Sequence, residues 1–312
     1  MIRRLNLPVG IALAAFALAV PFMKAPILAD AGFRAAALVM IAVSWNMMAG
    51  AGLVSLGHSA FWGLGSYVAV LCANDLHAPF LLSLLPALLA GALSGAGLAL
   101  LTGRLRGIYF AIATLASSEA LRVCASMLDG ITGGYNGLYL DSSLHPGPTV
   151  LSVAATLGAV LAALTAWAVS RSRYAYGLRA MRDNEPAAEM LGVAPIRFRA
   201  GIVAISGALA SLAGGINAWH GGYLDPGVAF DLQTTINAQI APILGGIYTL
   251  PGPILGGIAT IALDEATRAL LGSIVGASLM LFGVMLVVVV LAMPQGIYGV
   301  LTGSRRRRSL AR

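Results

Sequence analysis

The chain has 312 residues, of which 59% are hydrophobic and 10% are charged, whereas roughly 25% are charged in a soluble globular domain. A soluble protein of this length could not bury so many apolar residues in its core. The composition therefore excludes a soluble domain and predicts a membrane protein. The net charge of +7 comes almost entirely from arginine, because Lys24 is the only lysine. No glycine pattern precedes Lys24, which excludes ATP hydrolysis through a P-loop. The histidines and cysteines are not spaced as metal ligands are, and the sequence shows no pattern of a catalytic nucleophile with its base. We therefore expect no enzymatic activity, no metal and no cofactor.

Apolar runs of about 18 or more residues with few charges predict transmembrane helices, and breaks rich in glycine and proline divide the longest runs. The fold class is therefore an all-α polytopic membrane protein with about ten transmembrane helices, some of them short, broken or re-entrant. The third and eighth spans are the short or re-entrant ones. In chain order, the predicted spans are 5–23, 35–54, 60–73, 80–102, 107–127, 149–170, 200–219, 235–250, 253–271 and 274–293.

The first predicted span has a second interpretation. Arg3 and Arg4, the apolar run and the Ala-Asp-Ala sequence at 29–31 resemble a cleavable signal peptide. The run at 5–23 is long for the apolar region of a signal peptide, and its removal would leave nine spans. We therefore favour an uncleaved first helix.

Arginines are concentrated in particular segments between the spans. Six lie in 171–199, two in 104–106 and four in 305–308, whereas 128–148 and 220–232 carry aspartates. Short cytoplasmic loops accumulate Lys and Arg, so the basic segments are predicted to face the cytoplasm. With ten spans, both termini then also lie on the cytoplasmic side of a cell membrane.

No polar stretch is long enough to form a separate soluble domain. The longest, 171–199, has room for a short helix or two, so we predict one transmembrane domain over 1–304 and a basic cytoplasmic tail over 305–312. Small-residue spacings predict close helix packing, and a repeated Ile-Leu-Gly-Gly-Ile predicts two packed segments that meet at a turn. These spacings are Gly91/Gly95, Gly252/Gly256 and Gly272/Gly276, and the repeats are at 243–247 and 254–258.

A short helix is predicted within the cytoplasmic segment at about 184–191. Asp183 or Asn184 suits its N-cap, Pro186 its first turn and Gly192 its C-terminal cap.

The same helix would carry an apolar face. Ala187, Met190 and Leu191 recur at helical spacing, and such a face on a helix in water indicates a partner surface. The alternative is an interfacial helix that lies on the lipid headgroups.

Six sequence blocks spread along the chain carry a resemblance to a known family. They are Ser-Leu-Gly-His-Ser-Ala-Phe-Trp-Gly-Leu-Gly-Ser-Tyr at 55–67, Tyr-Phe-Ala-Ile-Ala-Thr-Leu at 109–115, Thr-Gly-Gly at 132–134 with Gly-Leu at 137–138, the loop at 177–192, Leu-Gly-Gly at 244–246 with Gly252, Pro253 and Gly256, and Pro-Gln-Gly-Ile at 294–297. In this order and spacing, the chain resembles the LivM-type permease subunits of branched-chain amino-acid ABC importers.

The resemblance implies a permease that forms half of a translocation pathway in the inner membrane of a bacterial cell. The expected partners are a homologous second permease subunit, two cytoplasmic ATPase subunits, a periplasmic substrate-binding protein and membrane lipid, but no nucleic acid. The implied substrates are branched-chain or other apolar amino acids, with urea and short amides as the cargo of relatives.

The resemblance also implies which residues contact the ATPase. The apolar face of the predicted helix would enter a groove of that subunit, and Glu185 and Glu189 would meet basic residues there. The predicted coupling residues are Arg179, Arg182, Asp183, Asn184, Glu185, Ala187, Glu189, Met190, Leu191 and Gly192.

Polar residues within the spans are candidates for the translocation pathway. Glu119 and Arg122 lie three residues apart, and either they neutralise each other or Glu119 lies on the route. His58 lies in a glycine-rich break, where free backbone amides could receive a substrate carboxylate or the histidine could satisfy backbone carbonyls. The predicted pathway residues are Ser55, Gly57, His58, Ser59, Glu119, Thr132, Gly133 and Gly134.

A different functional class is also consistent with the composition. A self-sufficient secondary transporter or channel for a small polar solute would need carboxylates within the spans to couple an ion. Glu119, Asp264 and Glu265 are the candidates for that role.

Overall fold

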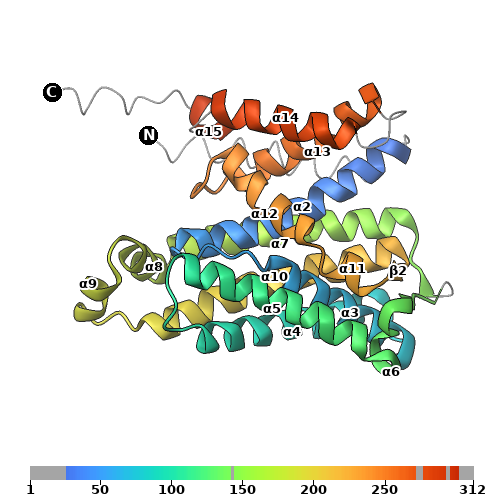
Figure 1. Cartoon of the computed structure of the whole chain (residues 1–312), viewed down its shortest axis with the longest axis horizontal. Coiled ribbons are helices and arrows are strands. Elements are labelled where there is room, and N and C mark those ends of the chain that lie inside the picture. Colours follow the sequence, from blue (N-terminus) through green and yellow to red (C-terminus); the bar gives the residue numbers. More distant parts are fainter. Residues whose placement is uncertain (1–25, 142–143, 272–276, 293–295, 302–312) are drawn as a thin grey trace.

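Helices dominate the computed structural model, which describes residues 26–141, 144–271, 277–292 and 296–301 (Figure 1). In chain order the elements are α2 (Pro26–Gly50), α3 (His58–Leu76), α4 (Phe80–Leu101), α5 (Ile108–Met127), α6 (Asp129–Thr132), η2 (Gly134–Asn136), β1 (Leu138–Tyr139), α7 (Pro148–Arg171), α8 (Tyr174–Asp183), α9 (Glu185–Met190), α10 (Pro195–Gly221), β2 (Tyr223–Leu224), α11 (Pro226–Ala229), α12 (Leu232–Gly245), α13 (Gly252–Leu271), α14 (Ala277–Ala292) and α15 (Gly296–Leu301).

The helices confirm an all-α membrane protein that crosses the bilayer several times. Helices occupy every predicted span from the second to the tenth, and α4, α5 and α7 match their predicted bounds to within one residue. Among the described helices, α2, α4, α5, α7 and α10 are each long and apolar enough to cross a membrane. The first predicted span, 5–23, and the basic tail, 305–312, lie outside the described residues.

Helix α2 begins earlier than predicted, at Pro26 rather than at residue 35. The sequence prediction stopped at the charged residues, but Asp30 and Arg34 lie one turn apart and form an ion pair, with 2.9 Å between Arg34 Nε and the carboxylate. Paired charges stabilise a helix at this spacing, so they do not end it.

Helix α10 is the centre of the bundle and packs against α2, α3, α4 and α7. Its closest neighbour is α4, because glycines remove the side chains between the two backbones. A Cβ at Gly91 would overlap the carbonyl oxygen of Gly207, a Cβ at Gly207 would overlap that of Gly91, and Gly95 faces the carbonyl of Val203. The predicted packing role of Gly91 and Gly95 is therefore confirmed.

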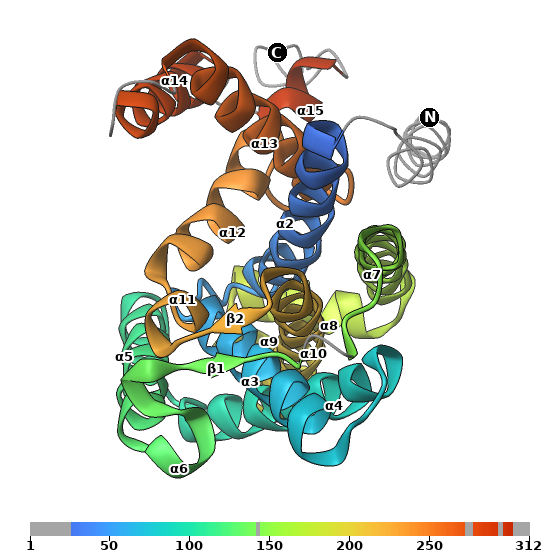
Figure 2. The ribbon, with the colours of Figure 1, turned by 90° about the vertical axis from the view of Figure 1, so that its right-hand side faces the viewer.

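Helices α12, α13 and α14 extend away from the group formed by α3, α4, α5 and α10 (Figure 2). The backbones of α12 and α13 are in direct contact where glycines leave no side chain between them. A Cβ at Gly245 would overlap Gly252, and a Cβ at Gly256 would overlap Ala241. The two repeated pentapeptides thus meet at a turn as predicted. The third predicted spacing, Gly272/Gly276, lies outside the described residues.

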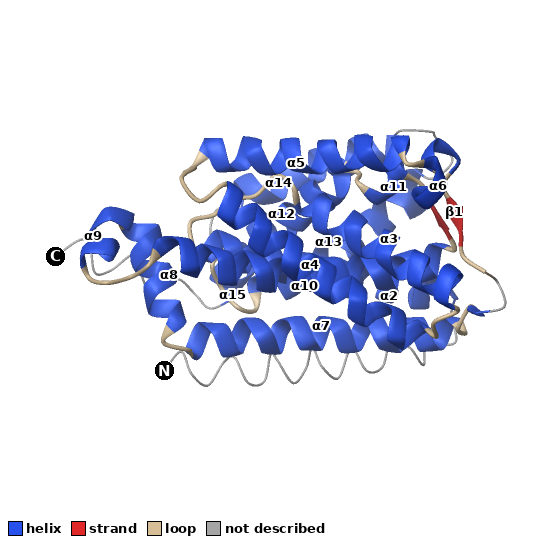
Figure 3. Ribbon diagram, turned by 90° about the horizontal axis from the view of Figure 1, so that it is seen from below, coloured by secondary structure: helices blue, strands red, loops and turns tan. Residues whose placement is uncertain are grey.

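The bundle has two different ends (Figure 3). The α9 end carries α8, α9 and the turn at 102–107, whereas the β1 end carries α6, η2 and a two-stranded antiparallel ladder. In the ladder, Leu138 pairs with Leu224 and Tyr139 with Tyr223. The sequence analysis did not predict this ladder, because two-residue strands leave no periodic pattern.

Candidate functional site

The short helix predicted in the segment 171–199 is present as α9. Asn184 is its N-cap, and its side-chain oxygen accepts a hydrogen bond from the backbone N–H of Ala187 at 3.2 Å. Pro186 lies in the first turn, and Gly192 follows the helix with φ of +89°. Only glycine adopts that conformation without strain, so the predicted caps are confirmed.

The apolar face of α9 is exposed at the end of the molecule, where α8 and α9 protrude beyond the bundle (Figure 1). Met190 is 89% exposed and Leu191 83% exposed, and Ala187 is exposed beside them. Ala188 is buried and anchors the opposite side of the helix. Two large apolar side chains therefore lie in open surroundings on a helix that is itself held in place.

Glu185 differs from the expectation that it faces a partner. Its carboxylate is 13% exposed and lies 2.6 Å from Arg199 Nη2 and 3.2 Å from Arg106 Nε. The buried guanidinium of Arg199 attracts the carboxylate inward, since a buried charge without a partner is costly. Glu189, by contrast, remains exposed on α9.

Arg179 and Arg182, the two arginines among the predicted coupling residues, lie on α8. Arg182 Nε lies 3.3 Å from Asp183 Oδ1, and its guanidinium lies 5.0 Å from the ring centroid of Tyr248 in the α12–α13 loop. Arg179 lies over the ring of Tyr176 at 6.0 Å. All the predicted coupling residues are therefore gathered at the α9 end.

Tyr174 holds α8 against α10. Its ring stacks on that of Phe198 with 4.7 Å between centroids, and its hydroxyl donates to the Phe198 carbonyl oxygen. Burial raises the pKa of the Tyr174 hydroxyl above its ordinary value.

Three predicted pathway residues, Ser55, His58 and Ser59, belong to a buried group of polar side chains inside the bundle, and Gly57 lies between Ser55 and His58 in the chain. We call this group the hydroxyl cluster. It joins the 51–57 loop and the start of α3 to α5, α10 and α12, and it consists of Ser55, His58, Ser59, Thr114, Ser118, Ser206 and Thr235, each at most 4% exposed.

Hydrogen bonds to hydroxyls of this cluster already satisfy three backbone amides, two in the break before α3 and one in its first turn. The N–H of Leu56 donates to Thr114 Oγ1 at 3.0 Å, that of Gly57 to Ser55 Oγ at 3.2 Å, and that of Ser59 to Thr235 Oγ1 at 2.9 Å. These three amides are therefore not free to receive a carboxylate in this conformation.

The side chain of His58 has no exposed surface. Its Nε2 lies 3.1 Å from Ser206 Oγ, and that hydroxyl donates its own hydrogen to the Ser44 carbonyl at 2.9 Å. His58 Nε2 must then be the donor, which leaves Nδ1 as a buried acceptor with no hydrogen-bond partner in the described part of the chain. The histidine satisfies a serine and not, as one interpretation held, a backbone carbonyl.

Glu119 is adjacent to Ser118 in the chain but points out of the bundle. Ser118 Oγ lies 2.8 Å from Ser59 Oγ inside, whereas the Glu119 side chain is 57% exposed and pairs with Arg122 Nε at 2.9 and 3.0 Å. The pair lies near the middle of α5, a helix at the edge of the bundle (Figure 2). Its neighbours on the same face are apolar and exposed, including Ile112 and Val123.

The remaining predicted pathway residues, Thr132, Gly133 and Gly134, lie at the β1 end, away from the hydroxyl cluster. Thr132 Oγ1 lies within hydrogen-bonding distance of the Ala125 and Leu128 carbonyls. Gly133 and Gly134 have φ of +70° and +54°. The three residues close the turn between α5 and β1, and their assignment to the pathway stays a prediction.

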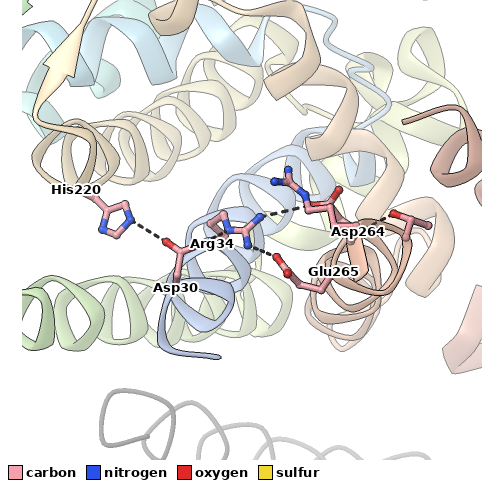
Figure 4. Close-up of polar contacts among 7 residues, drawn as sticks. Asp30, Arg34, His220, Asp264 and Glu265 are labelled. Atoms are coloured by element: carbon pink, nitrogen blue, oxygen red, sulfur yellow. Dashed lines mark hydrogen bonds and ion pairs between the residues drawn. The ribbon is translucent and has the colours of Figure 1, made fainter. Parts of the chain in front are cut away.

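A cluster of charges at the β1 end joins α2, α10 and α13 (Figure 4). Arg34 contacts Asp30, Asp264 at 3.3 Å and Glu265. His220 Nε2 lies 3.1 Å from Asp30 Oδ1. Asp264 also pairs with Arg268 at 3.0 Å. The sequence analysis missed this cluster because Asp264 and Glu265 lie far from Arg34 in the chain, and Asp30 lies far from His220.

Comparisons with known proteins agree with this architecture. The family model described as the permease component of branched-chain amino acid transport systems matches residues 27–290. The high-affinity branched-chain amino acid transport system permease protein LivM of Escherichia coli (strain K12) is 26% identical over 92% of this chain and 73% of its own length, and LivM of Salmonella typhimurium gives the same values. BraD of Pseudomonas aeruginosa, named as a permease protein of the same kind of system, is 32% identical over 42% of this chain and 41% of its own length. No solved structure matches the chain significantly.

Because the family model covers most of the sequence, the chain belongs to the family of permease components of branched-chain amino acid transport systems.

Proposed function

We propose that this chain is one of two homologous permease subunits of an ABC importer and forms half of a pathway for branched-chain or related amino acids. Two ATPase subunits on the cytoplasmic side would drive it, and a periplasmic binding protein would deliver the amino acid. The observation that carries the proposal is α9, a capped helix that holds Met190 and Leu191 almost fully exposed at the end of the molecule.

An ATPase groove is the partner that fits this helix. Burial of Met190 and Leu191 would contribute about 1.5–3 kcal/mol each, which favours docking once the helix is already ordered. Asn184 and Gly192 cap the helix, and Ala188 anchors it, so the partner need not order it first. Glu189, exposed on the same helix, is available to a basic residue of the partner.

The arginine distribution supports an orientation in which the α9 end faces the cytoplasm. We place the β1 end in the periplasm, both termini in the cytoplasm and the chain in the bacterial inner membrane. In this proposal, residues 1–304 form one transmembrane permease domain, and 305–312 form a basic cytoplasmic tail.

The exposed face of α5 is our candidate for the pathway. Glu119 and Arg122 lie near the middle of a membrane-spanning helix and point outward. Charges at that depth rarely face lipid, because the hydrocarbon does not solvate them. Contact with the second permease, or with water enclosed between the two permeases, would satisfy both charges.

The competing function, a self-sufficient secondary transporter, receives less support. It needs a carboxylate that is free to exchange an ion, and the three candidates are engaged with arginines. Glu119 is paired with Arg122, and Asp264 and Glu265 are both paired with Arg34.

Met190→Asp should abolish co-purification of the ATPase subunits and uptake of radiolabelled leucine, while insertion into the membrane stays normal. The change places a charge in the proposed apolar contact, and desolvation of an unpaired charge opposes docking. Pull-down of the complex from membranes measures the first effect, and transport in proteoliposomes measures the second.

Met127→Asp is the matched control, because Met127 is also strongly exposed, at 75%, but lies at the β1 end. It should leave ATPase binding unchanged. Normal ATPase binding and uptake in the Met190 variant would contradict the proposal, as would leucine uptake by the purified chain alone.

A labelling experiment tests the orientation. In a background with Cys72 and Cys124 changed to serine, a cysteine at Gly137 or Gly227 should react with an impermeant thiol reagent added from outside. A cysteine at Arg182 should react only after the membrane is permeabilised. The reversed pattern would overturn the orientation.

A further inference from the structure

Arg199 joins three elements at the α9 end through one buried guanidinium. Its side chain is 5% exposed and lies in the second turn of α10. Nη1 donates to the carbonyl oxygens of Gly103 at 2.8 Å and Leu105 at 2.9 Å, and Nη2 donates to Glu185 Oε2 at 2.6 Å. This side chain therefore links its own helix, α10, to the turn between α4 and α5 and to the first residue of α9.

The chemistry of this contact requires arginine. The planar guanidinium directs its N–H donors along fixed directions, so it can bind two backbone carbonyls and a carboxylate at once. A lysine would keep the charge but not this geometry. Arg106 also approaches Glu185, at 3.2 Å, but it is 59% exposed and contributes a weaker, solvent-screened attraction. Arg199 is thus the main link between Glu185 and the turn.

The turn held by Arg199 leads directly into α5. Gly107, the residue before α5, has φ of +56° and ψ of −125°, a conformation that glycine allows. A cavity of about 350 Å³ lies beside it, lined by Gly52, Arg106, Gly107, Glu185 and Arg199 among others. Space next to a glycine at the helix start permits the turn to move. Arg199 Nε has no hydrogen-bond partner within the described residues, so a rearrangement would not break a bond at that atom.

Movement of α5 would reach the candidate pathway. Near its middle, α5 is joined to the 51–57 loop through Thr114 and to the start of α3 through Ser118. The outward pair of Glu119 and Arg122 lies on the same turns of the helix. A helix transmits displacement along its length because its backbone hydrogen bonds hold it rigid.

We propose that the contact between Glu185 and Arg199 transmits the position of α9 to the α4–α5 turn, and through it to α5. This inference rests on the proposed function, because it assumes that α9 docks on an ATPase subunit. Arg199 is a positioning residue in this mechanism, since it contacts neither the transported amino acid nor ATP.

Arg199→Gln tests the inference in the complete complex, reconstituted in proteoliposomes with its ATPase subunits and binding protein. The quantity to measure is the amount of leucine taken up per ATP hydrolysed. We expect an assembled complex that still hydrolyses ATP, with this ratio reduced about fivefold or more, the usual lower range of coupling between distant sites. Arg199→Lys, which keeps the charge, should lose less. Arg197→Gln removes an exposed arginine from the first turn of the same helix and should keep the wild-type ratio.

Glu185→Gln provides a second variant that leaves the bonds from Arg199 to the turn in place. It should also lower the leucine-to-ATP ratio without loss of assembly. A wild-type ratio in both variants would overturn the inference. Loss of assembly and of thermal stability in both variants would also overturn the inference, because Arg199 would then only stabilise the fold. Failure of the proposed function is distinguishable, since in that case the wild-type chain would not bind the ATPase at all.

Discussion

Gly57→Ala is expected to abolish leucine uptake and to remove most of the folded protein from the membrane. A Cβ at this position would overlap the carbonyl oxygen of Thr114 on α5. The backbones of α5 and of the break before α3 would have to separate, which costs about 1–3 kcal/mol or more in a packed interior. Separation would also weaken the hydrogen bond from Leu56 to Thr114 Oγ1. Size-exclusion profiles and thermal unfolding of the purified chain measure this effect.

Gly97→Ala is the matched control for this experiment. Gly97 lies within α4, and a Cβ there meets no atom within 4 Å. Alanine favours a helix over glycine by about 1 kcal/mol, so this variant should be as stable as the wild type or more stable. If Gly57→Ala unfolded at the wild-type temperature, the close packing of α5 against the break would be wrong.

Glu119→Gln should reduce leucine uptake by about tenfold or more while the complex assembles normally. Glutamine keeps the size and hydrogen-bonding capacity of the side chain but removes its charge. Hydrogen bonds that involve a charged group contribute about 1.5–3 kcal/mol, and about 1.4 kcal/mol corresponds to a factor of ten in rate. Transport assays in proteoliposomes, with subunit content checked on a gel, give both quantities.

Two further variants show whether the loss of uptake is specific to the Glu119 carboxylate. Asp75→Asn removes an exposed carboxylate from the last turn of α3 and should leave uptake unchanged. Glu119→Gln combined with Arg122→Gln removes both charges of the pair. We expect uptake by this double variant to stay as low as that of Glu119→Gln, because the carboxylate itself is proposed to lie on the route. Restored uptake would show instead that the two residues only neutralise each other.

Much of the fold was predictable because lipid imposes simple requirements on a spanning segment. A helix must be long and apolar, so α4, α5 and α7 were located to within one residue. The caps of α9 were predictable for a similar reason, since Asn184 and Gly192 act on the backbone within a few residues of their own position.

The polar interior was only partly predictable. Ser55, His58 and Ser59 were identified, but Thr114, Ser118, Ser206 and Thr235 were not. A single hydroxyl in an apolar span looks like an ordinary helix-packing residue, because nothing local shows which neighbour it will face. Arg199 is one of six arginines in the segment 171–199, and nothing in the sequence indicates that it is buried against the α4–α5 turn.

The protein class, most helix positions and the short helix α9 can all be predicted from the sequence alone. These depend on composition, on periodicity and on capping residues, all of which act between near neighbours. The packed helices were needed to show that Glu185 turns inward to Arg199, that Glu119 points out of the bundle, and that Arg34 joins α2 to α13. Each of these depends on which helix faces which, and contacts between residues far apart in the chain settle that choice.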